Sequence, residues 1–153
     1  MIPEEEILDN LKDMGYILAS PRALYPSYYK LADGTIIKAL ININYLIPDP
    51  QSPQGFAINS TNTVSAFVPR ENRHPELFKE YNPADILKSV VDDDVNFEVL
   101  RENFSVYDLS NDMVLSVKTV VGQIRKTSLY TRDGEPIYHI NTNPIIKAKK
   151  PQK

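Results

Sequence analysis

The chain has 153 residues, of which 42% are apolar, 24% charged and 9% aromatic, and it contains no cysteine. This length predicts one domain or two small ones. The missing cysteines exclude disulfide scaffolds, thiolate zinc sites, iron–sulfur clusters and cysteine nucleophiles. No stretch approaches the 18 consecutive apolar residues of a membrane span, and the acidic start does not resemble a signal peptide. We expect a soluble, cytoplasmic globular protein without membrane contact.

The net charge of −3 is distributed unevenly along the chain. Residues 1–76 carry a net charge of −3, residues 77–117 carry −6, and residues 118–153 carry +6. A segment of one sign creates a local field even in a mildly acidic protein. A solvated, lysine-rich tail is the simpler interpretation of the basic end, because many domains finish in one.

Two stretches of the chain match two later ones, which predicts an internal duplication. Residues 29–46 align with residues 107–124 at an offset of 78, and residues 56–69 align with residues 138–151 at an offset of 82. Several aligned positions are apolar in both copies, such as Ile36 with Val114 and Ile37 with Leu115. The identical pairs begin at Tyr29, Leu31, Ile58, Asn59, Ala66 and Pro69.

The repeat divides the chain into two units. We predict a first unit over residues 1–72, a polar, proline-containing linker over 73–81, and a second unit over 82–153. Each unit is expected to contain a short helix followed by antiparallel strands.

The two predicted helices have recognisable ends and an apolar face. Pro3 suits a first helical turn, the acidic residues after it favour the positive end of the helix dipole, and Gly15 can end the helix in a left-handed conformation. Asn82 is a plausible N-cap for the second helix, with Pro83 next to it. Both helices are therefore expected to pack on the rest of the protein. Their apolar stripes are Ile7, Leu8, Leu11 and Met14 in the first, and Ile86, Leu87, Val90 and Val91 in the second.

In the first unit, alternation of apolar and polar residues predicts two hairpins. The first joins residues 28–31 to residues 37–45 through a tight turn at 32–35, where a glycine supplies a positive φ. The second joins residues 56–60 to residues 64–68.

The second unit repeats this order of elements. Residues 104–109 precede a long apolar run over residues 114–130. A turn at 132–135 then leads to two short strands, over residues 136–140 and 145–149.

A helix followed by four or five short, bent strands in about 70 residues is typical of a mainly β fold built from small barrels. The order of elements is analogous to that of Sm-like and SH3-like barrels, although the resemblance is one of pattern alone. Residues 57–64 lie where such folds place their last hairpin, but they lack the Arg-Gly with which Sm proteins contact RNA. Two tandem barrels, or one fused barrel about a pseudo-two-fold axis, both fit.

The sequence offers little for catalysis. His74 lies in the predicted linker with Arg70 and Arg73, where a solvated linker is a simpler interpretation than a phosphate site, and His139 lies on a strand; neither has a zinc-ligand companion. The run Asp92–Asp94 lacks the spacing of a calcium loop. Serine nucleophile elbows, Walker loops and dinucleotide-binding glycine patterns are also missing. We predict no catalytic residue, no metal site and no cofactor.

Basic residues alternate with tyrosines in the second unit, which could serve to bind nucleic acid by stacking and phosphate contacts. Tyrosines also favour β-sheets through cross-strand packing, and a sequence pI near 5.4 is unusual for a nucleic-acid binder. The candidate nucleic-acid-binding residues are Lys118, Arg125, Lys126, Tyr130, Arg132, Tyr138, Lys147, Lys149 and Lys150.

One predicted strand is apolar on both faces, since Leu40 and Leu46 alternate with Ile41 and Ile43. Such a strand is covered on its outer side by a helix, by the other unit or by a second chain. We therefore predict a non-enzymatic interaction or assembly module with a protein partner or a second copy. Nucleic-acid binding through the basic second unit is the alternative.

Overall fold

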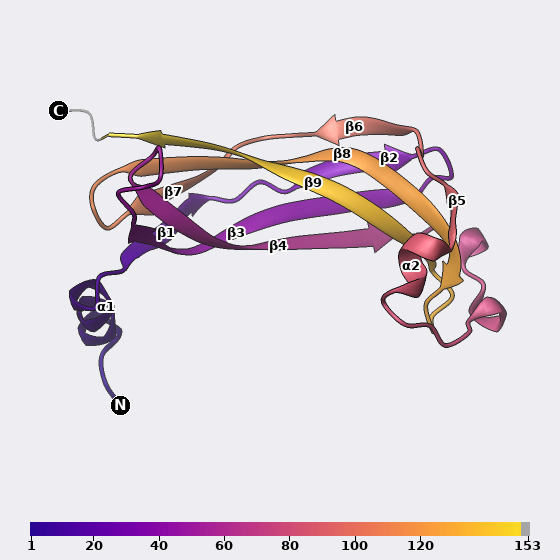
Figure 1. Ribbon diagram of the computed structural model, residues 1–153, viewed down its shortest axis with the longest axis horizontal. Coiled ribbons are helices and arrows are strands. Elements are labelled where there is room, and N and C mark those ends of the chain that lie inside the picture. Colours follow the sequence, from indigo (N-terminus) through magenta and orange to yellow (C-terminus); the bar gives the residue numbers. More distant parts are fainter. Residues whose placement is uncertain (151–153) are drawn as a thin grey trace.

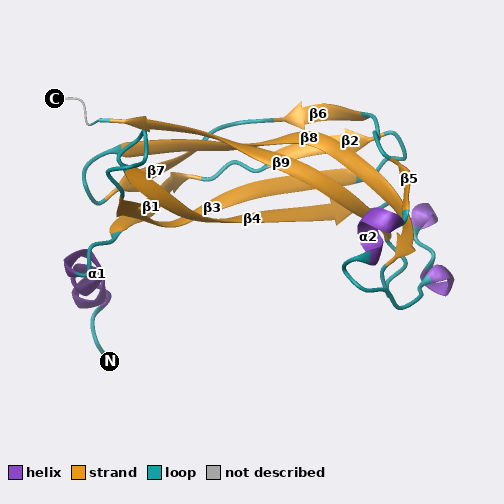
Figure 2. Ribbon diagram, in the orientation of Figure 1, coloured by secondary structure: helices purple, strands orange, loops and turns teal. Residues whose placement is uncertain are grey.

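The computed structural model describes residues 1–150, and its strands form one large antiparallel sheet (Figures 1 and 2). Within this range, no helix is both long and apolar enough to span a membrane. The helical segments are α1 (Glu4–Asp13), α2 (Asp85–Lys88) and the 3₁₀ turns η1 (Arg70–Asn72) and η2 (Pro75–Leu77). The strands are β1 (Ile17–Ala23), β2 (Ser27–Leu31), β3 (Ile36–Pro48), β4 (Phe56–Phe67), β5 (Val90–Asp92), β6 (Phe97–Arg101), β7 (Ser105–Leu109), β8 (Val114–Tyr130) and β9 (Pro136–Lys149).

The mainly β class is confirmed, but the small barrel is not formed. The strand order is β5-β8-β7-β1-β3-β2-β6, with β4 beside β3 and β9 beside β8. Closing a barrel requires the last strand to pair with the first. Here β4, β5, β6 and β9 each pair with a single strand within the described range, so the sheet keeps free edges.

The predicted hairpin in the first unit and the two short strands predicted at the end of the second are each one continuous strand. Residues 56–60 and 64–67 belong to β4, and residues 136–140 and 145–149 belong to β9. The polar stretch that indicated a turn in β4 contains two threonines, whose branched Cβ suits extended backbone. Pro144 is tolerated within β9 because that strand lies at an edge of the sheet.

The predicted helices are correct in position, but their packing and lengths differ from expectation. α1 has the predicted start and ends before Gly15, whose φ is +100°, yet no residue of α1 is fully buried. α2 begins at Asp85, with Ala84 in place of Asn82 at the N-cap position, and it ends at Lys88. Val90 pairs with Thr127 as part of β5. The β-branched pair Val90-Val91 favours a strand over a longer helix.

The two halves of the chain exchange strands. β1 begins beside β3, where Ile17 pairs with Leu46, and continues beside β7 of the second half. β6 of the second half pairs in turn with β2. Ala19 pairs with Leu109, and the residues 78 positions from each, Phe97 and Leu31, also pair. Strands of both halves therefore complete one sheet.

The sheet folds over so that β3 and β8 contact one another across the core. Two clusters of buried side chains fill the core, and both draw on each half of the chain. The first contains Ile41, Ile43, Leu46, Phe56, Tyr107, Leu109, Leu115 and Val117. The second contains Tyr29, Leu31, Ile37, Val95, Val121 and Ile124.

A bulge in β3 corrects the prediction that this strand is apolar on both faces. The register with β4 shifts between Ile43 and Tyr45, so the alternation of faces moves by one residue. Leu46 consequently joins Ile41 and Ile43 in the core, and Leu40 alone of the two leucines faces outward. β8 has the same shift between Val121 and Gln123.

Two buried tyrosines connect the halves across the core. The hydroxyl of Tyr107 accepts a hydrogen bond from the Ile43 N–H (3.3 Å), and that of Tyr29 accepts one from the Val121 N–H (3.2 Å). Tyr29 also donates to Glu102 Oε2 (2.5 Å). Each tyrosine thus accepts a hydrogen bond from a backbone N–H of the other half. The two N–H groups belong to Ile43 of β3 and Val121 of β8, and each directly precedes the bulge in that strand.

We expect Tyr29→Phe to lower the free energy of unfolding by about 1–3 kcal/mol, because it leaves a buried N–H and a carboxylate without their partner. Tyr107→Phe should cost less, since its hydroxyl has one such bond. Urea unfolding of both variants measures the difference. Equal losses would contradict the additional role assigned to Glu102.

The same residue predicts an alkaline effect. Burial, followed by the hydrogen bond to Glu102, raises the pKa of Tyr29 from 10.0 to about 12. A folded-state pKa above the unfolded value means that the contribution is complete below pH 10 and is lost as pH rises through about 12. The fall in urea midpoint over this interval should be less steep in Tyr29→Phe.

Candidate functional site at the seam between β4 and β9

The free edges of β4 and β9 flank an opening that we call the seam. Inner-face residues of the two strands, such as Val64 and Ala66 of β4 and Ile140 of β9, lie along it. Near its middle, Asn62 Nδ2 donates a hydrogen bond to Thr142 Oγ1 (2.5 Å). Val64 is 37% exposed although its β3 neighbour Ala39 is fully buried, so the core is uncovered along this side.

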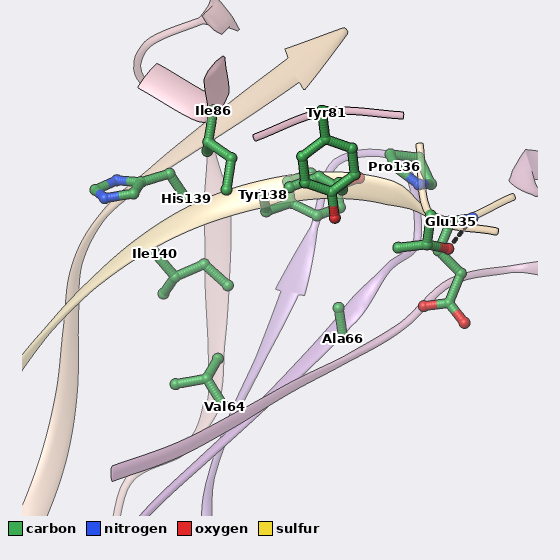
Figure 3. Close-up of a pocket in the computed structure, with 11 residues that line it drawn as sticks. Val64, Ala66, Tyr81, Ile86, Glu135, Pro136, Tyr138, His139 and Ile140 are labelled. Carbon is green, nitrogen blue, oxygen red and sulfur yellow. Dashed lines mark hydrogen bonds between the residues drawn. The ribbon is translucent and has the colours of Figure 1, made fainter. Parts of the chain in front are cut away.

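One end of the seam forms a pocket of about 460 Å³. Figure 3 shows Val64 and Ala66 on one side, with Tyr138 and Ile140 of β9 opposite. Tyr81, which precedes α2, and Ile86, which belongs to α2, lie over the opening (Figure 3). The lining is mostly apolar, with polar groups at the rim. Its members are Val64, Ala66, Tyr81, Ile86, Thr131, Glu135, Pro136, Ile137, Tyr138, His139 and Ile140.

The connection between the halves holds this end in place. The His74 N–H donates to the Gly134 carbonyl oxygen (2.7 Å), and Asn72 Nδ2 donates to the Asp33 carbonyl oxygen (3.0 Å). Gly134 has a φ of +85°, and a Cβ there would lie 2.3 Å from the Pro75 nitrogen. The contact therefore requires glycine, and it fixes η2 against the β8–β9 turn.

A polar cluster lies beneath the pocket and joins both halves of the chain. Tyr138 donates a hydrogen bond to Asp33 Oδ2 (2.5 Å), and its hydroxyl is 3.5 Å from Thr35 Oγ1. The Thr35 N–H donates to Asp33 Oδ1 (2.9 Å), and Lys126 Nζ is 3.8 Å from Asp33 Oδ2. These four side chains connect the β2–β3 turn with β8 and β9.

The cluster shifts the pKa values of two of its members. Partial burial opposes ionisation of Asp33, but hydrogen bonds from Tyr138 and Thr35, with the charge of Lys126, outweigh it and lower the pKa of Asp33. Burial, followed by the bond to Asp33, raises the pKa of Tyr138 well above its ordinary value. Asp33 is therefore a carboxylate, and Tyr138 a neutral donor, across the ordinary pH range.

The equivalent place at the other end of the seam is largely apolar. At offsets of 78 and 82, the positions of Asp33, Thr35 and Tyr138 correspond to Asn111, Met113 and Phe56. Phe56 is buried in the first core cluster, and Met113 packs against it. The charged cluster is thus specific to the end that carries the pocket.

The nine residues predicted to bind nucleic acid do not form one surface. Lys118 and Lys147 lie together, since each Nζ is 4.8 Å from the centroid of the Phe104 ring. Lys149 lies two residues further along β9, beside Val114. Lys150 follows directly. Because β9 spans about 3.3 Å per residue, this basic end is about 30 Å from Tyr138.

The remaining predicted residues occupy the pocket end and have other partners there. Lys126 and Tyr138 belong to the polar cluster. Arg132 lies over the Phe78 ring (4.7 Å) and 3.4 Å from Glu80. Tyr130 packs edge-to-face against His74. Arg125 donates to Gln123 Oε1 (3.3 Å).

The other residues considered for chemistry are dispersed. Arg73 donates to the Val68 carbonyl oxygen, and His74 Nδ1 is 3.3 Å from Glu76. His139 pairs with Arg125, and its buried Nδ1 has no hydrogen-bond partner. Within residues 1–150, no group of three histidine, aspartate or glutamate side chains is placed to hold a metal ion.

The sequence analysis did not identify Asp33 or Thr35 as candidate site residues, because it assigned both to a hairpin turn. Asp33 and Tyr138 are 105 positions apart, so no local motif joins them. A signal was nevertheless available in the repeat. The alignment places Asp33 opposite Asn111 and Tyr138 opposite Phe56. Asp33 and Tyr138 therefore replace less polar residues of the other copy, and this difference in polarity could have indicated them as site residues.

Comparisons of the chain with models of known protein families, with curated proteins and with solved structures found no match. The candidate site therefore rests on its geometry.

We expect Asp33→Asn to lower the free energy of unfolding by about 1–2 kcal/mol at pH 7, because Tyr138 and Thr35 lose a charged acceptor. A lowered folded-state pKa means that this contribution is complete above about pH 4 and disappears as pH falls through the pKa of Asp33. Urea unfolding at pH 7 and in acid should show the difference shrinking. Asn111→Ala at the other end is the control and should show no such pH dependence.

Proposed function

We propose that the chain is a non-enzymatic interaction module that accepts an extended segment of a partner along β4. The observation that carries the proposal is the composition of this edge. β4 has twelve residues, none of them charged and none proline or glycine. Proteins usually protect a long edge strand with charges, prolines or a covering element, because its unpaired backbone groups attract other strands.

The comparison with β9 strengthens this argument. β9 lies at the corresponding edge of the second half, and it contains Pro136, Pro144, Lys147 and Lys149. Those residues oppose the addition of a further strand. Of two edges with the same place in the sheet, one is protected and β4 is open.

The pocket supplies the second element of such a site. In strand addition, main-chain hydrogen bonds provide affinity and side-chain pockets provide specificity. Val64 and Ala66 of β4 line the pocket, so a segment paired with this part of β4 would place alternate side chains over it. The apolar lining favours an aliphatic or aromatic side chain, and Phe67, 56% exposed, adds apolar surface at the same end of β4.

We further propose that the two halves arose by internal duplication. The β1–β7 and β2–β6 ladders correspond at an offset of 78, including a register shift between Pro21 and Ala23 in one and between Tyr28 and Tyr29 in the other. Each pair of the β3–β4 ladder has a counterpart in the β8–β9 ladder over residues 114–126. These correspondences support the offsets of 78 and 82 in the sequence. The unit boundaries at residues 72 and 82 stay a prediction.

A labelled twelve-residue peptide with the sequence of Phe56–Phe67 is a suitable probe, because β4 is itself an uncharged strand. We expect it to bind, and Thr63→Lys to weaken binding by about tenfold or more, since a lysine on the edge opposes strand pairing. Fluorescence anisotropy measures affinity, and hydrogen exchange should show new protection in β4.

Ile145→Lys is the matched control, because it places a lysine at the corresponding outer position of β9. It should leave peptide affinity unchanged. Equal weakening by both variants, or protection located outside β4, would exclude strand addition at this edge.

Nucleic-acid binding is the second candidate, and one observation favours it. Lys118 and Lys147 flank the ring of Phe104, with Lys149 on the same strand. An aromatic ring among cations offers a stacking surface beside phosphate contacts. The pocket end does not contribute, because its basic side chains have acidic or amide partners.

Titration with single-stranded RNA and duplex DNA at several salt concentrations tests this candidate. If two phosphates are neutralised, Lys118→Glu/Lys147→Glu should lower the slope of log affinity against log salt by about 1.4 for a single strand. Arg125→Glu, at the far end, is the control and should change it little. Absence of binding at low salt, where electrostatic attraction is strongest, would eliminate the candidate.

A further inference from the structure

α1 presents an apolar face that the chain leaves uncovered. Ile7 is 45% exposed, Met14 68% and Leu8 36%, while Leu11 is half-buried. The helix projects from one end of the sheet, and it contacts β1 (Figure 1). A groove of about 490 Å³ remains between α1 and the strands beneath it.

The internal correspondence indicates where such a helix packs. At an offset of 79, Ile7 corresponds to Ile86 of α2. α2 contacts β8 and β9, and Ile86 covers the pocket end of the seam over Val64, Ala66 and Ile140. One helix of the corresponding pair therefore closes one end of the seam.

The opposite end of the seam has the equivalent apolar residues without a helix over them. The counterparts of Val64, Ala66 and Ile140 are Ile146, Ala148 and Ile58, each half-buried at the margin of the first core cluster. We call these three residues the bare end. Within residues 1–150, no helix contacts β4 or the last part of β9 to the extent that α2 contacts β8 and β9.

The connection to β1 is too short for α1 to cover the bare end of its own chain. Ile58 pairs with Leu46, which pairs with Ile17, so α1 would have to cross β3 from β1 to β4. That distance is about 9.6 Å for two strand spacings, before allowing for the helix radius of about 5 Å. The three linking residues, 14–16, extend at most about 10 Å. In the second half, the longer segment 89–94, which includes β5, joins α2 to Val95 beside Ile124.

Tyr16 further fixes the direction of the helix. Its ring packs edge-to-face on Tyr45 of β3, with centroids 5.0 Å apart. Tyr16, the last linking residue, is thus held against β3 and does not reach β4 on the other side of that strand.

The charges of the two surfaces are complementary. α1 contains five acidic residues and one lysine. The bare end is bordered by Lys147 and Lys149 on β9, with Lys150 directly after them. An acidic helix with an apolar stripe fits a basic surface with apolar side chains at its centre.

We propose that α1 docks on the bare end of a second copy of this chain, forming a symmetric dimer with two such contacts. Ile7, Leu11 and Met14 of one copy pack against Ile58, Ile146 and Ala148 of the other. Glu4 and Glu6, the acidic residues nearest this stripe, lie beside Lys147 and Lys149. The proposal does not depend on strand addition. It shares Ile58 with β4, but the pocket residues Val64 and Ala66 lie at the other end of that strand.

Charge reversal of each surface tests the dimer. Light scattering during size-exclusion chromatography should give a concentration-dependent dimer for the full chain. Glu4→Lys/Glu6→Lys, at the acidic positions nearest the apolar stripe of α1, and Lys147→Glu/Lys149→Glu should each raise its dissociation constant about tenfold or more. All four residues are exposed, so circular dichroism should be unchanged.

Mixing the two reversed variants provides the decisive control. In the mixed dimer, each reversed surface meets a complementary one, so dimerisation should return. Thr63→Lys should leave the dimer intact, which separates this result from a failure of strand addition. A monomer at all concentrations, a dimer unaffected by either reversal, or no recovery on mixing would overturn the proposal.

Discussion

β1 starts beside β3 and ends beside β7, and β6 pairs with β2 of the opposite half. Each half thereby supplies the strand that the sheet of the other half lacks. This exchange places β3 and β8 on opposite sides of one core, and it allows Tyr29 and Tyr107 to reach backbone donors across it. One side of β3 pairs with β1 and β2, and one side of β8 pairs with β5 and β7. β4 and β9 occupy the other sides, and their outer edges remain free.

The two ends of the seam differ because the connection between the halves lies at only one of them. Residues 69–89 contact both hairpin turns at that end and place Ile86 over the pocket. The polar cluster around Asp33 is found there, whereas its counterpart around Phe56 is apolar. A nearly symmetric framework consequently carries two chemically different surfaces. One is an apolar pocket beside an open strand, and the other is a basic end with half-buried apolar side chains.

Local patterns in the sequence predicted the hairpin turns, the start of α1 and the long apolar run of β8, because each depends on neighbouring residues. They failed where distant pairing decides. The shift at Asn44 that brings Leu46 into the core depends on β4, and the continuity of β4 through its polar middle depends on β3. Val90 and Val91 fit the apolar stripe of a helix in the sequence, but in the structure Val90 pairs with Thr127 of β8. The Asp33–Tyr138 contact joins residues 105 positions apart, which no local pattern predicts.

The strand exchange also determines when this protein can fold. Ala19 finds its partner only after Leu109 has been synthesised, and Ile17 and Leu46 precede the β7–β8 hairpin that completes their cluster. Contacts so distant in sequence carry a large loop-closure cost, and they are associated with folding in milliseconds to seconds. A chain emerging from the ribosome therefore holds β3 and β4 as an incomplete sheet until the second half arrives. During that interval its open edges can pair with other chains, which favours aggregation until the second half completes the sheet.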